Sequence, residues 1–152
     1  MPNSDVRFQW HHGFEVGHPA IDDDHKALLD CLNRIAKYFA ISRGEDAYEE
    51  CLNFRAEIER HFEKENRFLR VIQFPRWQRH LTSHSKFTDH LLTYCAFCGE
   101  RCRKSQEEEC LTDLYAMLVE HFIKGDLDFK SYLEHENLAN KQRRNGPSGS
   151  NT

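Results

Sequence analysis

Seven residues of this sequence have the side-chain types and the spacing of ligands for metal ions. They are five histidines and two acids: His25, His61, Glu65, His80, His84, His121 and Asp126. His61 with Glu65, and His80 with His84, have i,i+4 spacing, which places both members of each pair on one helical face, about one turn apart. Imidazole and carboxylate ligands without thiolate suit iron, and also manganese or zinc. These residues therefore indicate a metal site without selecting the metal.

The segments that carry these residues have the apolar periodicity of amphipathic helices. They predict long helices over about 19–40, 46–71, 75–102 and 105–124, and a short helix over about 127–138. Asp46 and Glu49 have the spacing of a capping box at the start of the second helix. Ser105 and Glu108 repeat that spacing at the start of the fourth, and Gly125 is expected to end it. The fold class is therefore predicted to be all-α.

Short connections between these helices predict an up-down-up-down four-helix bundle, preceded by an irregular arm over residues 1–18. In such a bundle, the start of the first helix, the end of the second, the start of the third and the end of the fourth lie at one level. All seven candidate ligands come from those helix ends and should converge. Because a buried cluster of imidazoles and carboxylates needs compensating positive charge, a metal is expected. Seven ligands suit two bridged ions better than one.

Composition favours one compact domain over residues 1–140 and a polar, disordered tail over residues 141–152. The formal net charge of -4 gives no general attraction to nucleic acid or to anionic membranes. No stretch approaches the roughly 20 apolar residues that a membrane span requires. The residues before position 8 also lack the apolar segment of a signal peptide. We therefore expect a cytoplasmic protein without nucleic-acid or membrane partners, and its protein partners stay unknown.

Four motifs around the candidate ligands resemble those of the hemerythrin family. The run V-G-H-P-A-I-D-D-D-H-K over residues 16–26 resembles its first-helix signature, and H-F-E-K-E over residues 61–65 resembles its H-F-x-x-E motif. H-x-x-x-H over residues 80–84 and H-x-x-x-x-D over residues 121–126 resemble the other two. They occur in the family's order, and the resemblance covers roughly residues 8–135. The long interval between His84 and His121 resembles the bacterial branch.

The resemblance implies a protein that binds dioxygen reversibly at a non-haem di-iron centre, to carry, store or sense it, and that is not an enzyme. It assigns one iron ion to His80, His84 and His121, the other to His25 and His61, and both to the bridging carboxylates Glu65 and Asp126. An oxo or hydroxo group completes the bridge. The ion with two histidines then keeps an open position for dioxygen.

Apolar residues next to the ligands are candidates for the wall of the dioxygen pocket. Leu28, Phe62, Leu118 and Phe122 lie one or three residues from ligands, and Trp10 of the arm is a candidate lid. The alternative is that all five are ordinary core residues.

Two features depart from the pattern of the family. Cys95, Cys98, Cys102 and Cys110 are predicted to point into the end of the bundle away from the metal. They are interpreted as small core residues, with a redox-sensitive thiol pair or a second metal site as alternatives. Asn66 stands where the family often has a second Glu, which is expected to change local charge and not ligation.

Two other classes of function use the same constellation. A di-iron enzyme could act on peroxide or nitric oxide, and an iron-dependent module could regulate a partner or donate iron. The one E-x-x-H match, from Glu15 to His18, lies in the glycine-containing arm. The paired helical E-x-x-H motifs of ferritin-like di-iron oxidases are therefore absent from the sequence.

Overall fold

The computed structural model describes the backbone of residues 6–100 and 107–144, and the side chains of residues 6–93, 107–123 and 127–136. Within those ranges every regular element is helical, so the all-α prediction is confirmed. The elements are η1 (His12–Phe14), α1 (Pro19–Ala40), α2 (Gly44–Val71), α3 (Trp77–Glu100), α4 (Glu107–Glu120), η2 (His121–Asp126) and α5 (Leu127–Arg144).

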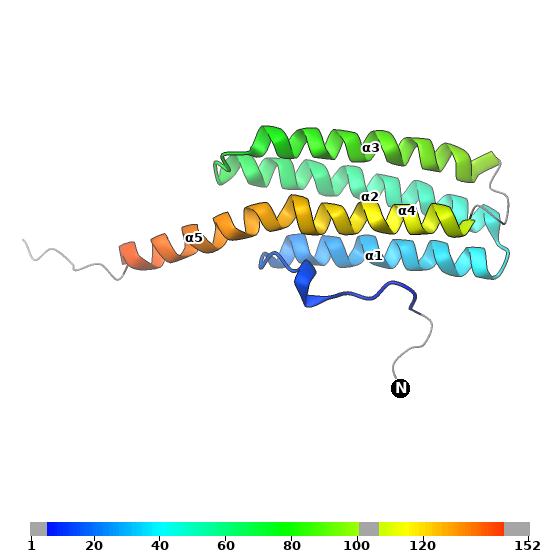
Figure 1. Cartoon of the computed structure of the whole chain (residues 1–152), viewed down its shortest axis with the longest axis horizontal. Coiled ribbons are helices and arrows are strands. Elements are labelled where there is room, and N and C mark those ends of the chain that lie inside the picture. The colour runs from blue at the N-terminus through cyan, green and yellow to red at the C-terminus, as the bar shows by residue number, and fades with distance from the viewer. Residues whose placement is uncertain (1–5, 101–106, 145–152) are drawn as a thin grey trace, which may run out of the picture.

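The four helices α1 to α4 lie side by side along the length of the molecule (Figure 1). α2 contacts α1 and α3, and α4 also contacts α1 and α3, so the four enclose a common interior. The chain reverses direction between α1 and α2 and again between α2 and α3 (Figure 1). α5 continues from α4 through η2 and extends beyond the other helices at one end (Figure 1).

The turns after α1 and α2 share one capping geometry. At the end of α1, the amide of Arg43 donates to the carbonyl of Tyr38 at 2.8 Å and that of Ser42 to Phe39 at 3.1 Å. This is the Schellman pattern, and Ser42 takes the left-handed conformation it requires, with φ 59°. Gln73 does the same after α2, with φ 56°. Glycine is the usual residue at such positions, so both turns hold side chains in a costly conformation.

The predicted capping box at Asp46 does not form, and the one at Ser105 lies partly outside the described residues. α2 begins at Gly44, and its N-cap Arg43 makes no side-chain capping bond. Asp46 instead forms an ion pair with Arg43. Glu108 receives two hydrogen bonds from Arg7, at 2.7 and 2.6 Å, and its predicted partner Ser105 lies outside the described residues.

The predicted end of the fourth helix at Gly125 is wrong. The chain passes through the π-helical turn η2 and continues as α5 to Arg144, beyond the predicted boundaries at 138 and 140. A glycine inside a helix costs only about 1 kcal/mol. Burial of Phe129, which is 0% exposed, with Tyr132 and Leu133 packed beside it, offsets that cost. Residues 145–152 of the predicted tail lie outside the described residues.

Two apolar clusters lie on either side of the histidines. The larger one fills the bundle and includes Cys31 and Cys51. The smaller one lies where the start of α5 meets the turn between α2 and α3, and contains Val16, Leu69 and Phe129. The histidines that lie between them are at most 5% exposed.

The segment before α1 packs across the bundle (Figure 1). Phe8 stacks on Tyr115 of α4 with ring centroids 4.4 Å apart. Its backbone exchanges two hydrogen bonds of 2.9 Å with the Asn33 side chain of α1. The segment is therefore anchored to both helices, although among its described residues only η1 is regular.

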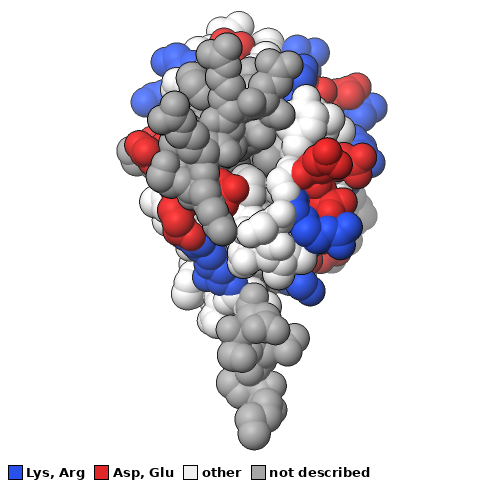
Figure 2. Space-filling view, turned by 90° about the vertical axis from the view of Figure 1, so that its right-hand side faces the viewer, with Lys and Arg blue, Asp and Glu red and all other residues white. Residues whose placement is uncertain are grey.

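The surface carries both signs of charge. At the end of the molecule shown in Figure 2, lysine and arginine side chains are interspersed with aspartate and glutamate. Surface ion pairs such as Arg34 with Glu50 and Arg55 with Glu59 have the same mixed character. None of the helices searched in the described residues has the length and apolar character needed to cross a membrane.

Candidate metal centre

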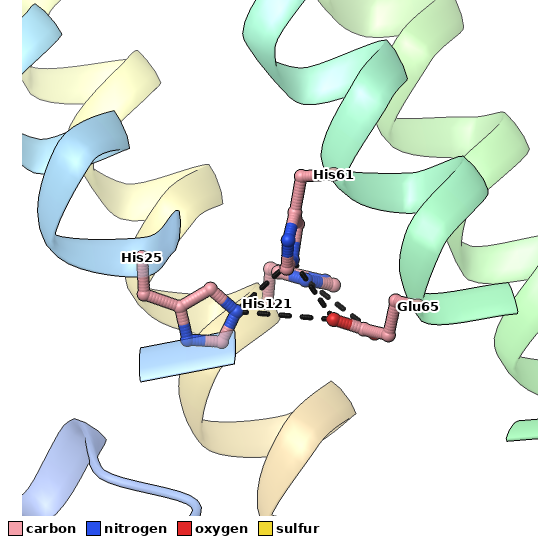
Figure 3. Close-up of side chains that lie close together, drawn as sticks. All are labelled: His25, His61, Glu65 and His121. Carbon is pink, nitrogen blue, oxygen red and sulfur yellow. Dashed lines mark hydrogen bonds and ion pairs between the residues drawn. The ribbon is translucent and has the colours of Figure 1, made fainter. Parts of the chain in front are cut away.

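Six of the seven predicted ligands come together in the interior. They are His25 from α1, His61 and Glu65 from α2, His80 and His84 from α3, and His121 at the start of η2; none is more than 5% exposed. Figure 3 shows His25, His61, Glu65 and His121 pointing toward one another from three different segments. The side chain of Asp126 lies outside the described part of the chain. The helix periodicity thus brings six polar residues to one level.

Glu65 is the centre of the cluster. Its Oε2 lies 2.8 Å from Nε2 of His61 and 3.8 Å from Nε2 of His25. Its Oε1 lies 2.5 Å from Nε2 of His80 and 3.1 Å from Nε2 of His84. Each carboxylate oxygen therefore faces its own pair of imidazoles, as a carboxylate does when it bridges two metal ions.

His121 lies between the two halves of the cluster. Its Nε2 is 4.0 Å from Oε1 of Glu65, the oxygen that also faces His80 and His84. Its ligand atom also lies within 4.8 Å of those of His25, His61 and Glu65, whereas Glu65, His80 and His84 form a second such group. Both groups could hold a metal ion. The contact with Oε1 agrees with the predicted pairing of His121 with the α3 histidines. The distances among ligand atoms also allow His121 to pair with His25 and His61.

Two polar residues fix the orientation of two of these imidazoles. Nδ1 of His84 lies 2.8 Å from Oδ1 of Asn66, to which it donates. Nδ1 of His61 lies 3.2 Å from Oδ2 of Asp24, which also accepts from Lys64. With the proton on Nδ1 in each ring, Nε2 is left with a lone pair that points into the cluster.

The protonation states suit metal ligands. Burial lowers the pKa of His84 to about 4, and the nearby Glu65 carboxylate offsets only part of that effect, so the ring is neutral at pH 7. Burial raises the pKa of Glu65, but contacts with His25, His61, His80 and His84 outweigh it and hold the pKa well below its usual value. Metal ions bind the neutral imidazole and the ionised carboxylate.

The contact between His84 and Glu65 brings two acceptor atoms together. The low pKa of His84 keeps its ring neutral. The neutral ring uses its proton on Asn66, so its Nε2 presents a lone pair to Oε1 of Glu65. Two acceptors at 3.1 Å repel each other. A cation between them removes the repulsion and satisfies both groups.

Aromatic rings pack directly against the histidines. Phe62 stacks on His84 with centroids 3.9 Å apart and planes 5° from parallel. Phe122 stacks on His25 at 4.3 Å, and Phe87 and Phe129 contact the cluster from further along the bundle. These rings shield the cluster from water, which strengthens every electrostatic interaction within it.

The predicted pocket residues occupy two layers. Phe62 and Phe122 contact ligand imidazoles, whereas Leu28 and Leu118 are buried in the surrounding core at 1% and 0% exposed. Trp10 is partly buried and meets the edge of Phe122 at 6.0 Å, so Phe122 separates it from His25. The role of Trp10 as a lid stays a prediction.

The remaining histidines and cysteines lie elsewhere. His11, His12, His90 and His135 are exposed, and His18 is half-buried against Phe68. Cys110 is buried in the main core. The predicted thiol cluster also needs the side chains of Cys95, Cys98 and Cys102, which lie outside the described residues.

Asp24 and Asn66 are the residues that the sequence analysis missed. Asp24 is the last of three consecutive aspartates, and its contact with His61 in the structure is what distinguishes it from the other two. Asn66 was noted as a departure from the family, but its hydrogen bond to His84 depends on the side-chain conformation. The only signal in the sequence for these two residues is that each is adjacent to a predicted ligand. That adjacency does not identify which imidazole the side chain bonds to.

Comparison with known proteins does not identify a relative. No known protein family matches the chain, and no curated protein matches it. The site is therefore the basis for a proposed function.

Proposed function

We propose that this cluster holds two iron ions and binds dioxygen reversibly, in an up-down-up-down bundle of the hemerythrin type. The observation that carries the proposal is the division of the histidines between the two oxygens of Glu65. A single ion would gather its ligands around one point. Two sets of imidazoles on opposite oxygens of one carboxylate suit two ions that share it.

In the proposed assignment, His80, His84 and His121 hold one ion, and His25 and His61 hold the other. The pair His80 and His84 lies on the Oε1 side of Glu65 together with His121. The pair His25 and His61 lies on the Oε2 side, with their Nε2 atoms 3.0 Å apart. The ion with fewer protein ligands would retain the open position that an exogenous ligand needs.

Asp126 is proposed as the second bridging carboxylate. It ends the π-helical turn that His121 begins. A π-helix closes with i→i+5 hydrogen bonds, so residues five apart are about one turn apart. The spacing from His121 to Asp126 matches that geometry, whereas an α-helix would separate them by more than a quarter turn.

The contribution of the protein is to hold these ligands rigidly and to exclude water. When bound, the iron pair would supply the electrons on which reversible dioxygen binding depends. Phe62 and Phe122 cover the imidazoles of His84 and His25, and both phenylalanines are at most 5% exposed. Rings packed this closely exclude the protons and water whose entry would make dioxygen binding irreversible.

A His61→Ala variant tests the ligand assignment. Iron content per chain should fall from two to one or less, and the reduced protein should lose dioxygen binding. His90→Ala is the matched control, because His90 is exposed in the same molecule and contacts no ligand in the described structure. Retention of two irons and of dioxygen binding in His61→Ala would contradict the assignment.

A further inference from the structure

An open groove lies beside the candidate metal centre and is not used by the proposed function. Its volume is about 950 Å³, and it runs between α3 and the junction of α4 with η2. His80 and His121 form part of its lining, and Phe87 and Met117 add apolar surface. The volume is within the range of pockets that bind small organic molecules.

One face of α3 supplies polar groups to this groove. Arg79, Ser83 and Lys86 all line it, and their i, i+4, i+7 spacing aligns them on the same side of the helix. All three are exposed, so their polar atoms are open to solvent. A guanidinium, a hydroxyl and an ammonium group in one row are the donors that oxyanions bind.

The positive charge of Arg79 and Lys86 is available to a ligand. In the described part of the chain, neither forms an ion pair. Arg76, which also lines the groove, is by contrast held by both carboxylate oxygens of Asp128. Glu120 is the other acid in the lining, on the α4 side. Three cations and two acids give this groove an excess of one positive charge in a chain whose net charge is -4.

We propose that this groove binds a small organic phosphate monoester. The phosphate is bound by Arg79, Ser83 and Lys86, whose three donor groups match its three terminal oxygens. The apolar part of the ligand lies against Phe87 and Met117, which line the same groove. Inorganic phosphate alone would leave most of 950 Å³ filled with water, so both parts of the ligand contribute.

This site differs from the dioxygen site in position and in chemistry. The groove opens on the side of His80 and His121. The ion proposed to bind dioxygen would be held by His25, which is 0% exposed and covered by Phe122. The donors of the groove are surface cations rather than metal ligands. The inference therefore does not require iron, and its failure would leave the di-iron proposal untouched.

Calorimetric titration of the purified protein with phenyl phosphate tests the inference. At matched ionic strength, phenyl phosphate should bind more tightly than either inorganic phosphate or phenol. The double variant Arg79→Ala/Lys86→Ala should weaken binding by about 10-fold or more, because two charge-assisted hydrogen bonds are lost. The control Lys37→Ala/Arg67→Ala removes two exposed cations outside the groove and should leave the affinity unchanged.

Two results would overturn the proposal. Unchanged affinity in Arg79→Ala/Lys86→Ala would show that phenyl phosphate binds elsewhere, for instance at a metal ion. Equal affinities for phenyl phosphate and inorganic phosphate would show that the apolar wall of the groove takes no part. Circular dichroism of each variant confirms that the helices remain folded, since all four substituted side chains are exposed.

Discussion

Replacing Asn66 by alanine removes one hydrogen bond to a candidate ligand and leaves the ligand itself in place. Nδ1 of His84 donates to Oδ1 of Asn66 at 2.8 Å, and the His84 side chain is only 4% exposed. In Asn66→Ala that buried N–H has no acceptor from position 66. An unsatisfied buried donor costs about 1–3 kcal/mol. Because Asn66 is itself half-buried, water can replace part of the bond, and we expect about 1–2 kcal/mol.

The same loss should weaken metal binding. Residues that orient a metal-ligating histidine typically change metal affinity by about 10–100-fold. Each factor of ten corresponds to about 1.4 kcal/mol. We expect iron affinity to fall by about 10-fold or more in Asn66→Ala. Asn66→Asp should retain the affinity, because a carboxylate accepts the same hydrogen bond, and its added negative charge should lower the reduction potential of the site.

Competition with an iron chelator measures the affinity, and urea unfolding of the metal-free protein measures the stability. Asn53→Ala is the matched control, since Asn53 lies on the same helix and is exposed. If Asn66→Ala equalled the unsubstituted protein in both assays, the reasoning that Asn66 positions His84 would be refuted.

Three further predictions concern stability and reactivity. Burial holds the pKa of His84 at about 4, below its ordinary 6.5, so between pH 6.5 and 4 the protein takes up a proton when it unfolds. The free energy of unfolding of the metal-free protein should therefore fall by roughly 3 kcal/mol as pH falls through that range. Urea midpoints measure it, and midpoints that do not change with pH would contradict the prediction. Ser42→Gly and Gln73→Gly should each raise stability by about 0.5 kcal/mol by relieving a positive φ, seen as a higher Tm, whereas a lower Tm in both would contradict the strain. Burial raises the pKa of the Cys31 thiol to about 11, so iodoacetamide at pH 8 should label Cys31 only after unfolding. Mass spectrometry of the peptide that contains Cys31 measures the labelling, and prompt labelling of the native protein would disprove the prediction.

The sequence predicts the helices well because each carries a long apolar stripe. The predicted first helix and α1 have the same limits, Pro19 to Ala40. The failure at Gly125 has a tertiary cause. Local propensity favours a stop there, but the apolar contacts of Phe129 continue the helix into α5, and these come from segments far away in the chain. The capping box at Asp46 fails for a similar reason, because α2 begins earlier, at Gly44, and Asp46 pairs with Arg43.

The convergence of six predicted ligands follows from helix period and chain order, which a sequence contains. Their finer arrangement does not. Which oxygen of Glu65 faces which imidazole depends on side-chain torsions and on the helix packing. The same is true of the hydrogen bonds that His61 and His84 donate to Asp24 and Asn66. The groove beside His121 likewise depends on the separation of two helices. Sequence periodicity does not specify these distances.

The most direct test of the central claim is the visible spectrum of the iron-loaded protein, reduced without air and then exposed to it. We expect two irons per chain and a charge-transfer band that appears when air is admitted and disappears when it is removed. Immediate conversion to a stable ferric form would contradict reversible dioxygen binding, and absence of any iron band would contradict the di-iron centre.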